Sequence, residues 1–142
     1  MRVVAVLLLL CTNVQCDRAK QEIPAMKDID MIQGTWALIS GERHGEKFTD
    51  EVVKNVKLTF VGDILKTQKK NDVTEAVFTL HPEKNPKGID LDMDGSLGRG
   101  IYKLEGKMLT ILHGEIEEPR PAGFDALKSG NLTMLVLRKE RE

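Results

Sequence analysis

One short segment sets the pattern of this chain: Val56-Lys57-Leu58-Thr59-Phe60-Val61-Gly62-Asp63-Ile64-Leu65-Lys66-Thr67. Apolar Val56, Leu58 and Phe60 alternate with polar residues, which is the period of a strand with one buried face. The pair Gly62-Asp63 has the composition of a tight turn, and a second strand-like run follows it. The segment therefore predicts two antiparallel strands joined by a hairpin.

The same pattern continues on both sides of this hairpin. A strand-like run at 34–40 precedes it, and residues 49–54 form one helical candidate, with a capping threonine followed by acids in the first turn. Five more strand-like runs follow the hairpin, at 73–80, 89–94, 97–104, 108–112 and 132–137, with a Gly/Pro-rich loop before the last. Eight short strands predict an all-β fold. We expect a small eight-stranded antiparallel barrel with one short connecting helix, because closing the sheet removes its free edges.

The composition limits the possible classes of protein. The chain has 142 residues, of which 41% are hydrophobic and 30% are charged, so it suits one folded domain. Its 21 basic and 22 acidic residues give a net charge of −1, and no basic surface for nucleic acid is expected. The high charged fraction also excludes a membrane-spanning body. We expect no cofactor.

The first 16 residues have the features of a secretory signal peptide. Arg2 is followed by the apolar run Val3–Leu10, which is too short to span a membrane, and a cleavage site is expected after Cys16. The protein would then be exported, to the periplasm or outside the cell, without a cysteine. Alternatively, Cys16 could carry a lipid anchor. The expected organisation is a signal peptide at 1–16, a polar tether at 17–31, a barrel domain at 32–139 and a charged tail at 140–142.

A family resemblance rests on several segments. Gly34-Thr35-Trp36 looks like the Gly-x-Trp signature that opens the first strand of lipocalins and related calycin barrels. The other matching segments are Lys57-Leu58-Thr59-Phe60, Asn85-Pro86-Lys87-Gly88-Ile89-Asp90-Leu91, Gly100-Ile101-Tyr102-Lys103-Leu104, Arg120-Pro121 and Leu135-Val136-Leu137-Arg138. Together they resemble a lipocalin-like domain family common in planctomycete bacteria, often exported, whose biochemical function is not established. The resemblance spans residues 32–139.

The resemblance also implies structural roles for three residues. In lipocalins the signature tryptophan lies at the closed end of the barrel, with an arginine of the last strand stacked across it. Gly34, Trp36 and Arg138 stand at the matching positions. One departure is Leu112, since many relatives carry a cysteine at about this place.

The sequence contains only weak indications of a metal-binding or catalytic site. Asp90, Asp92 and Asp94 match the first half of a calcium loop, but its twelfth position is Ile101 rather than a carboxylate. Three aspartates on one strand face stand about 7 Å apart, so a solvated face is the stronger reading and a weak surface cation site the alternative. The histidines 44, 81 and 113 have no metal-ligand spacing, and there is no Gly-x-Ser-x-Gly elbow. We expect no catalytic residue and no metal site.

The barrel interior is the expected binding region. An eight-stranded barrel can either pack shut or hold one small ligand. The candidate ligand-binding residues are Leu58, Phe60, Phe78, Ile101, Tyr102, Met108, Arg120 and Met134. Arg120, beside a proline, could cap the barrel mouth or hold an anionic group.

The functional expectation is an exported, non-enzymatic binding module for a small apolar or amphipathic ligand. The alternative is a packed barrel that binds an envelope protein or a polysaccharide through its surface. The oligomeric state stays open.

Overall fold

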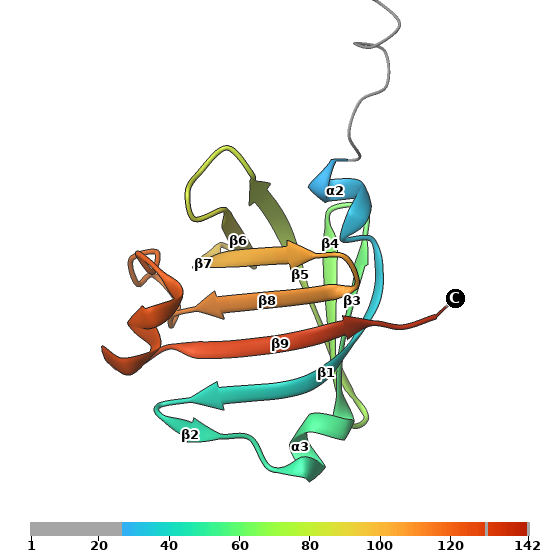
Figure 1. Cartoon of the computed structure of the whole chain (residues 1–142). Helices are drawn as coiled ribbons and strands as arrows, with labels where there is room; N and C mark the ends of the chain where they lie inside the picture. The colour runs from blue at the N-terminus through green and yellow to red at the C-terminus, as the bar shows by residue number, and fades with distance from the viewer. Residues whose placement is uncertain (1–26, 130, 142) are drawn as a thin grey trace, which may run out of the picture.

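The computed structural model describes residues 27–129 and 131–141, and it is dominated by strands (Figure 1). Its elements are α2 (Asp28–Met31), β1 (Gly34–Arg43), β2 (Glu46–Lys47), α3 (Asp50–Asn55), β3 (Val56–Val61), β4 (Ile64–Lys69), β5 (Asp72–His81), β6 (Gly88–Met93), β7 (Ser96–Glu105), β8 (Met108–His113), a 3₁₀ helix η1 (Phe124–Ser129) and β9 (Thr133–Lys139). The expected signal peptide at 1–16, with Cys16, and most of the expected tether lie outside the described residues.

The strands form one closed antiparallel barrel. From β3 to β9 each strand pairs with the next one in the chain, and β1 pairs with both β3 and β9. A bulge between Leu38 and Ser40 bends β1 as it closes the sheet. The short β2 pairs only with the end of β1, so eight strands make the barrel wall. The prediction of an eight-stranded antiparallel barrel is confirmed.

The hairpin between β3 and β4 forms where the sequence placed it. Val61 pairs with Ile64, and Gly62 adopts a φ of +61° between them. This left-handed conformation favours glycine, because a Cβ atom would be strained there. The chain thereby reverses in two residues and keeps Leu58 and Leu65 on the buried face of the sheet.

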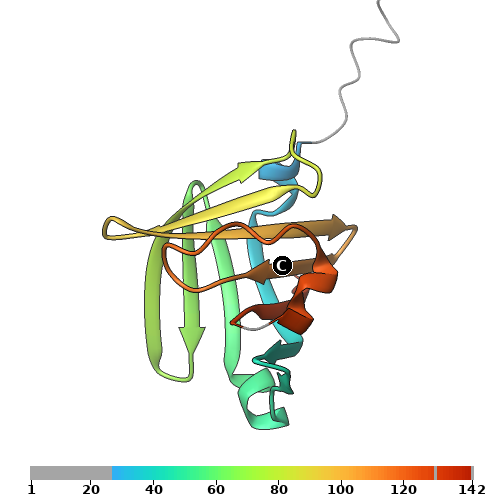
Figure 2. The same ribbon diagram turned by 90° about the vertical axis from the view of Figure 1, so that its left-hand side faces the viewer.

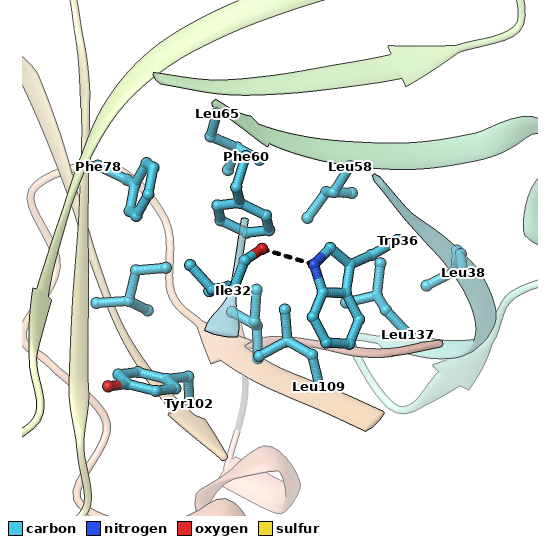
Figure 3. Packing of buried hydrophobic residues seen from close by; sticks show 12 residues of the cluster. Ile32, Trp36, Leu38, Leu58, Phe60, Leu65, Phe78, Tyr102, Leu109 and Leu137 are labelled. Atoms are coloured by element: carbon cyan, nitrogen blue, oxygen red, sulfur yellow. Dashed lines mark hydrogen bonds between the residues drawn. The ribbon is translucent and has the colours of Figure 1, made fainter. Parts of the chain in front are cut away.

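The closed end of the barrel is packed around Trp36. The indole is fully buried, and its Nε1 donates a 2.8 Å hydrogen bond to the carbonyl oxygen of Ile32 (Figure 3). Ile32 directly follows α2 and is itself fully buried. Phe60 and Phe78 meet edge to face nearby, with ring centroids 5.0 Å apart. Such pairs add about 0.5–1.5 kcal/mol to the burial of the two rings.

The helical content is a little larger than expected. The expected helix is α3, where the Thr49 hydroxyl accepts a hydrogen bond from the backbone N–H of Val52. The 3₁₀ helix η1 interrupts the expected loop. The helix α2 lies within residues 17–31, where only a tether was expected. Four residues are too few to show a helical period in the sequence.

The long connection between β8 and β9 crosses the outside of the barrel (Figure 2). The backbone N–H of Glu117 donates to the carbonyl oxygen of Leu97, and the Glu117 carboxylate accepts from the N–H of Leu97. This connection covers part of the outer wall, where Ile101 and Leu112 are fully buried. It also covers residues 96–99 of β7 on the side where, within the described residues, β8 does not extend beside them.

Candidate functional site

A cavity of about 650 Å³ lies at the end of the barrel away from Trp36; we call it the barrel-end cavity. Its lining residues are Arg43, Phe48, Val52, Asn55, Val56, Leu58, Leu65, Thr67, Lys69, Lys70, Asp72, Thr74, Leu91, Met93, Ile111, His113, Thr133 and Leu135. Ligand sites commonly occupy 300–1,000 Å³ and have mostly apolar walls. The barrel is therefore packed at one end and hollow at the other.

Strand register explains this division. Trp36 pairs with Leu58 across β1 and β3, so Leu58 stands where the packed core ends and the cavity begins. On β3, Phe60 points into the core and Val56 lines the cavity. Because side chains of one strand alternate, residues two apart share the inner face and reach different depths.

The segment between β1 and β3 covers one side of the cavity. Phe48 stacks against the backbone of Gly41, where an added Cβ would collide with the phenyl ring. Its N–H also donates to the Gly41 carbonyl oxygen. From α3, Val52 and Asn55 reach the cavity, although no residue of this helix is buried.

Another side of the cavity has less backbone cover. β5 pairs with β6 only from Val77 to His81, so within the described residues no strand lies beside Asp72 and Thr74 on that side. Both side chains line the cavity.

The charged groups of the cavity are mainly cationic. Arg43, Lys69 and Lys70 line it together with a single carboxylate, that of Asp72. Arg43 also faces Glu115 at 3.4 Å, in an ion pair whose side chains are about half exposed. Such exposed pairs contribute roughly 0–1 kcal/mol, so Glu115 holds the Arg43 guanidinium only weakly.

His113 is the titratable group set into the inner wall. Burial lowers the pKa of its imidazole, and the charges of Arg43 and Lys69 lower it further, against the effects of the Gly114 carbonyl and Glu115. Its Nδ1 lies 3.1 Å from the Gly114 carbonyl oxygen. A neutral ring that donates from Nδ1 leaves Nε2 as an acceptor.

Of the eight expected ligand-binding residues, only Leu58 lines the barrel-end cavity. Phe60, Phe78 and Tyr102 point inward but lie in the packed core. Ile101, Met108 and Met134 stand on the outer face of their strands, because their neighbours Tyr102, Leu109 and Leu135 face inward. Adjacent residues of a regular strand cannot both face the interior.

Arg120 lies outside the barrel, away from the cavity. Its Nη2 is 2.8 Å from Asp90 Oδ1, and its Nη1 donates to the Gly100 carbonyl oxygen at 2.9 Å. His81 Nε2 lies 2.8 Å from the other oxygen of Asp90. An added Cβ at Gly88 would approach Arg120 Nη1 to 2.8 Å, so this glycine makes room for the guanidinium. Arg120 thus fastens the β8–β9 connection to β6 and β7.

Of the other two aspartates of the calcium-like segment, Asp92 lies in β6 and bonds to the turn that follows it, and Asp94 lies in that turn. Asp92 Oδ1 accepts a 2.8 Å hydrogen bond from the N–H of Gly95, and Asp94 has a φ of +54°. Both are exposed, whereas Asp90 is covered by Arg120. Within residues 27–129 and 131–141, no three His, Cys, Asp or Glu side chains are placed to hold one metal ion.

A different cation from the one expected contacts Trp36. The Nζ atom of Lys139 lies over the ring, while Arg138 is exposed. The correction follows from alternation: Leu137 faces inward, so Arg138 faces out and Lys139 returns to the inner side. Gly34 opens β1 with a φ of +114°, a conformation that L side chains rarely adopt.

A polar cluster missed from the sequence holds α2 on the closed end. The Tyr102 hydroxyl donates to Asp28 Oδ2 at 2.6 Å, and Lys87 Nζ donates to the same oxygen at 2.8 Å. Burial alone would raise the pKa of the Asp28 carboxyl, but these hydrogen bonds outweigh it and lower the pKa below 3.8. Burial and the Asp28 charge raise the pKa of Tyr102.

Comparisons with known proteins leave the fold as the main guide. No protein-family model matches the chain, and no curated protein matches it. In the part of the chain that the structure covers, none of the helices has the length and apolar character needed to cross a membrane. The closed eight-stranded antiparallel barrel fits a lipocalin-like fold.

Proposed function

We propose that this protein is a non-enzymatic binding module that holds a small apolar or amphipathic molecule in the barrel-end cavity. The supporting observation is the cavity of about 650 Å³ at the end of a barrel whose other end is packed. A filled interior would have favoured the alternative, a packed barrel that binds envelope proteins or polysaccharide through its surface. Membership of the lipocalin-like family of planctomycetes is part of the proposal, as is export after cleavage at Cys16.

The cavity walls support this choice of ligand. Leu58, Leu65, Ile111 and Leu135 supply aliphatic surface at its inner side. Removing apolar surface from water contributes about 25 cal/mol per Å², so a ligand with an apolar chain would gain most from this wall. The polar groups near the mouth would leave a head group in contact with water.

The polar clusters outside the cavity support a role without catalysis. His81 and Asp90 form a hydrogen-bonded pair, but the third member is the Arg120 guanidinium, which is a donor and not a nucleophile. This cluster is explained by its attachment of the β8–β9 connection.

The test is to fill the cavity. Thr67 lines it, whereas the next residue, Gln68, is exposed on the other face of β4. We expect Thr67→Trp to abolish binding of a fluorescent apolar probe, cis-parinaric acid methyl ester, and the matched control Gln68→Trp to leave it unchanged. Fluorescence titration measures both. Equal binding by the two variants, or no binding by the unchanged protein, would contradict the proposal.

A further inference from the structure

The charged residues of the barrel-end cavity are unevenly distributed. Arg43, Lys69 and Lys70 face it, against the one carboxylate of Asp72. Lys70 has a partner outside the lining, Glu51 at 3.2 Å, with both side chains more than half exposed. For Lys69 there is no ion pair or side-chain hydrogen bond anywhere in the described part of the chain. Asp72 stands directly across from Lys69 in the β4–β5 ladder, but no ion pair joins the two side chains, so the Lys69 ammonium stays available to a ligand.

The positive field reaches the inner wall. Arg43 extends from the end of β1, where its backbone pairs with Thr133, and Thr133 pairs in turn with His113. Lys69 ends β4, whose inward positions Leu65 and Thr67 also line the cavity. At His113 the charges of Arg43 and Lys69 act against the opposing charge of Glu115. Low-dielectric walls strengthen such a field by focusing it.

We propose that the ligand is an anionic amphipath, with its apolar chain against Leu58 and Ile111 and its anionic head group between Arg43 and Lys69. This inference rests on the proposed ligand-binding function and adds the chemical class of the head group. A carboxylate there offsets cations that already face the cavity. A neutral head group gains less, and a cationic one is repelled.

The experiment compares head groups on one apolar chain. The probes are cis-parinaric acid, its methyl ester and the corresponding primary alcohol, titrated by fluorescence against the full chain at low salt. We expect the acid to bind more tightly than the ester and the alcohol. Added salt should weaken the binding of the acid alone. Equal affinity for all three, or tighter binding of the ester, would overturn the anionic assignment and leave the proposed function standing. If none of the three binds, the proposed function fails as well.

Two charge-neutralising variants locate the head group. Lys69→Gln and Arg43→Gln should each weaken binding of the acid by about two- to five-fold, the range of a partly exposed charge pair, and change binding of the ester less than binding of the acid. The matched control is Lys66→Gln, on the same strand but exposed and facing Glu75 at 4.0 Å. An equal loss in Lys66→Gln would show a general surface effect and contradict the assignment.

A charge reversal gives a second, independent test of where the head group lies. Lys69→Glu should bind the primary amine with the same chain better than the unchanged protein does, which loss of folding could not produce. An amine affinity that does not rise would contradict the position of the head group.

Discussion

Lys139 Nζ lies 5.6 Å from the centroid of the Trp36 ring and donates a 3.0 Å hydrogen bond to the carbonyl oxygen of Met31. One ammonium thus joins the end of β9 to the start of β1 and to α2. The cation–π contact contributes about 0.5–2 kcal/mol. This closes the barrel end with a lysine where the resemblance had pointed to the neighbouring arginine.

Lys139 should therefore matter more for stability than Arg138. We expect Lys139→Met to lower the free energy of unfolding by roughly 1–2 kcal/mol, through loss of the ring contact and the hydrogen bond. Arg138→Met, on the exposed face, should change it by less than about 0.5 kcal/mol. Urea unfolding measures both, and a larger loss in Arg138→Met would restore the original assignment.

The packed end should carry much of the stability. Trp36→Ala should cost roughly 3–5 kcal/mol, as for large buried side chains in general. Val52→Ala on the exposed α3 should cost far less, because no residue of this helix is buried. A loss near zero in Trp36→Ala, measured by the same unfolding, would contradict the placement of the core.

Arg120 should act on the β8–β9 connection and not on the ligand. Arg120→Met removes the partner of Asp90 and of the Gly100 carbonyl, and we expect a loss of roughly 1–3 kcal/mol. Hydrogen exchange should quicken at Glu117, whose N–H is held by Leu97, while probe binding stays unchanged. The control is Arg99→Met, since Arg99 makes one 3.4 Å contact with the Glu118 carbonyl. Lost probe binding in Arg120→Met would place this residue in the site after all.

His113 should make the protein less stable in mild acid. Its pKa in the folded state is lowered by burial first and then by the cations near it, whereas the unfolded chain has the ordinary value of 6.5. Below pH 6.5 the unfolded state binds more protons than the folded state. The free energy of unfolding therefore decreases as the pH is lowered, until the pH lies below the folded pKa. In His113→Gln this part of the loss should disappear. Unfolding between pH 7.5 and 5 at about half-unit steps tests it, and identical pH profiles would contradict it.

Asp28 should also make the protein less stable in acid, but at a lower pH than His113 does. Its folded pKa lies below the ordinary value of 3.8. Its contribution to the free energy of unfolding is therefore present above pH 3.8 and is lost as the pH falls through the folded pKa. Asp28→Asn should be less stable than the unchanged protein at neutral pH and lose less in acid. Asp30→Asn, on the same α2 and exposed, is the control. Thermal unfolding at pH 6 and pH 3 distinguishes them, and equal behaviour of the two variants would contradict the role of the Tyr102 and Lys87 hydrogen bonds.

Local sequence pattern was sufficient for the barrel but not for its cavity. Alternation at Val56, Leu58 and Phe60, with glycine in the turns, predicted the strands because these signals act between near neighbours. The same alternation would have separated Ile101 from Tyr102 and Arg138 from Lys139, had it been applied strictly to the site residues. The cavity cover from Phe48 depends on how its ring packs on Gly41 across the β1–β2 hairpin, and strand alternation does not encode that contact.

The position of the Arg120 side chain could not be predicted from local sequence either. The sequence marked it through its proline neighbour, but its partners Asp90 and Gly100 stand 20 or more positions away. Whether such a guanidinium faces a cavity or the outer wall is decided by the path of the β8–β9 connection. On that outer wall Ile101 and Leu112 are fully buried, although Ile101 was expected to face the interior.

The placement of Trp36 and the hollow at opposite ends of the same strands has a consequence for how this chain can change. Substitutions at Thr67 or Thr74 alter the cavity lining, and neither residue belongs to the packed core around Trp36. Directed evolution could randomise such lining positions alone. The shape of the hollow end can thus vary while the packed end, on which folding depends, stays unchanged.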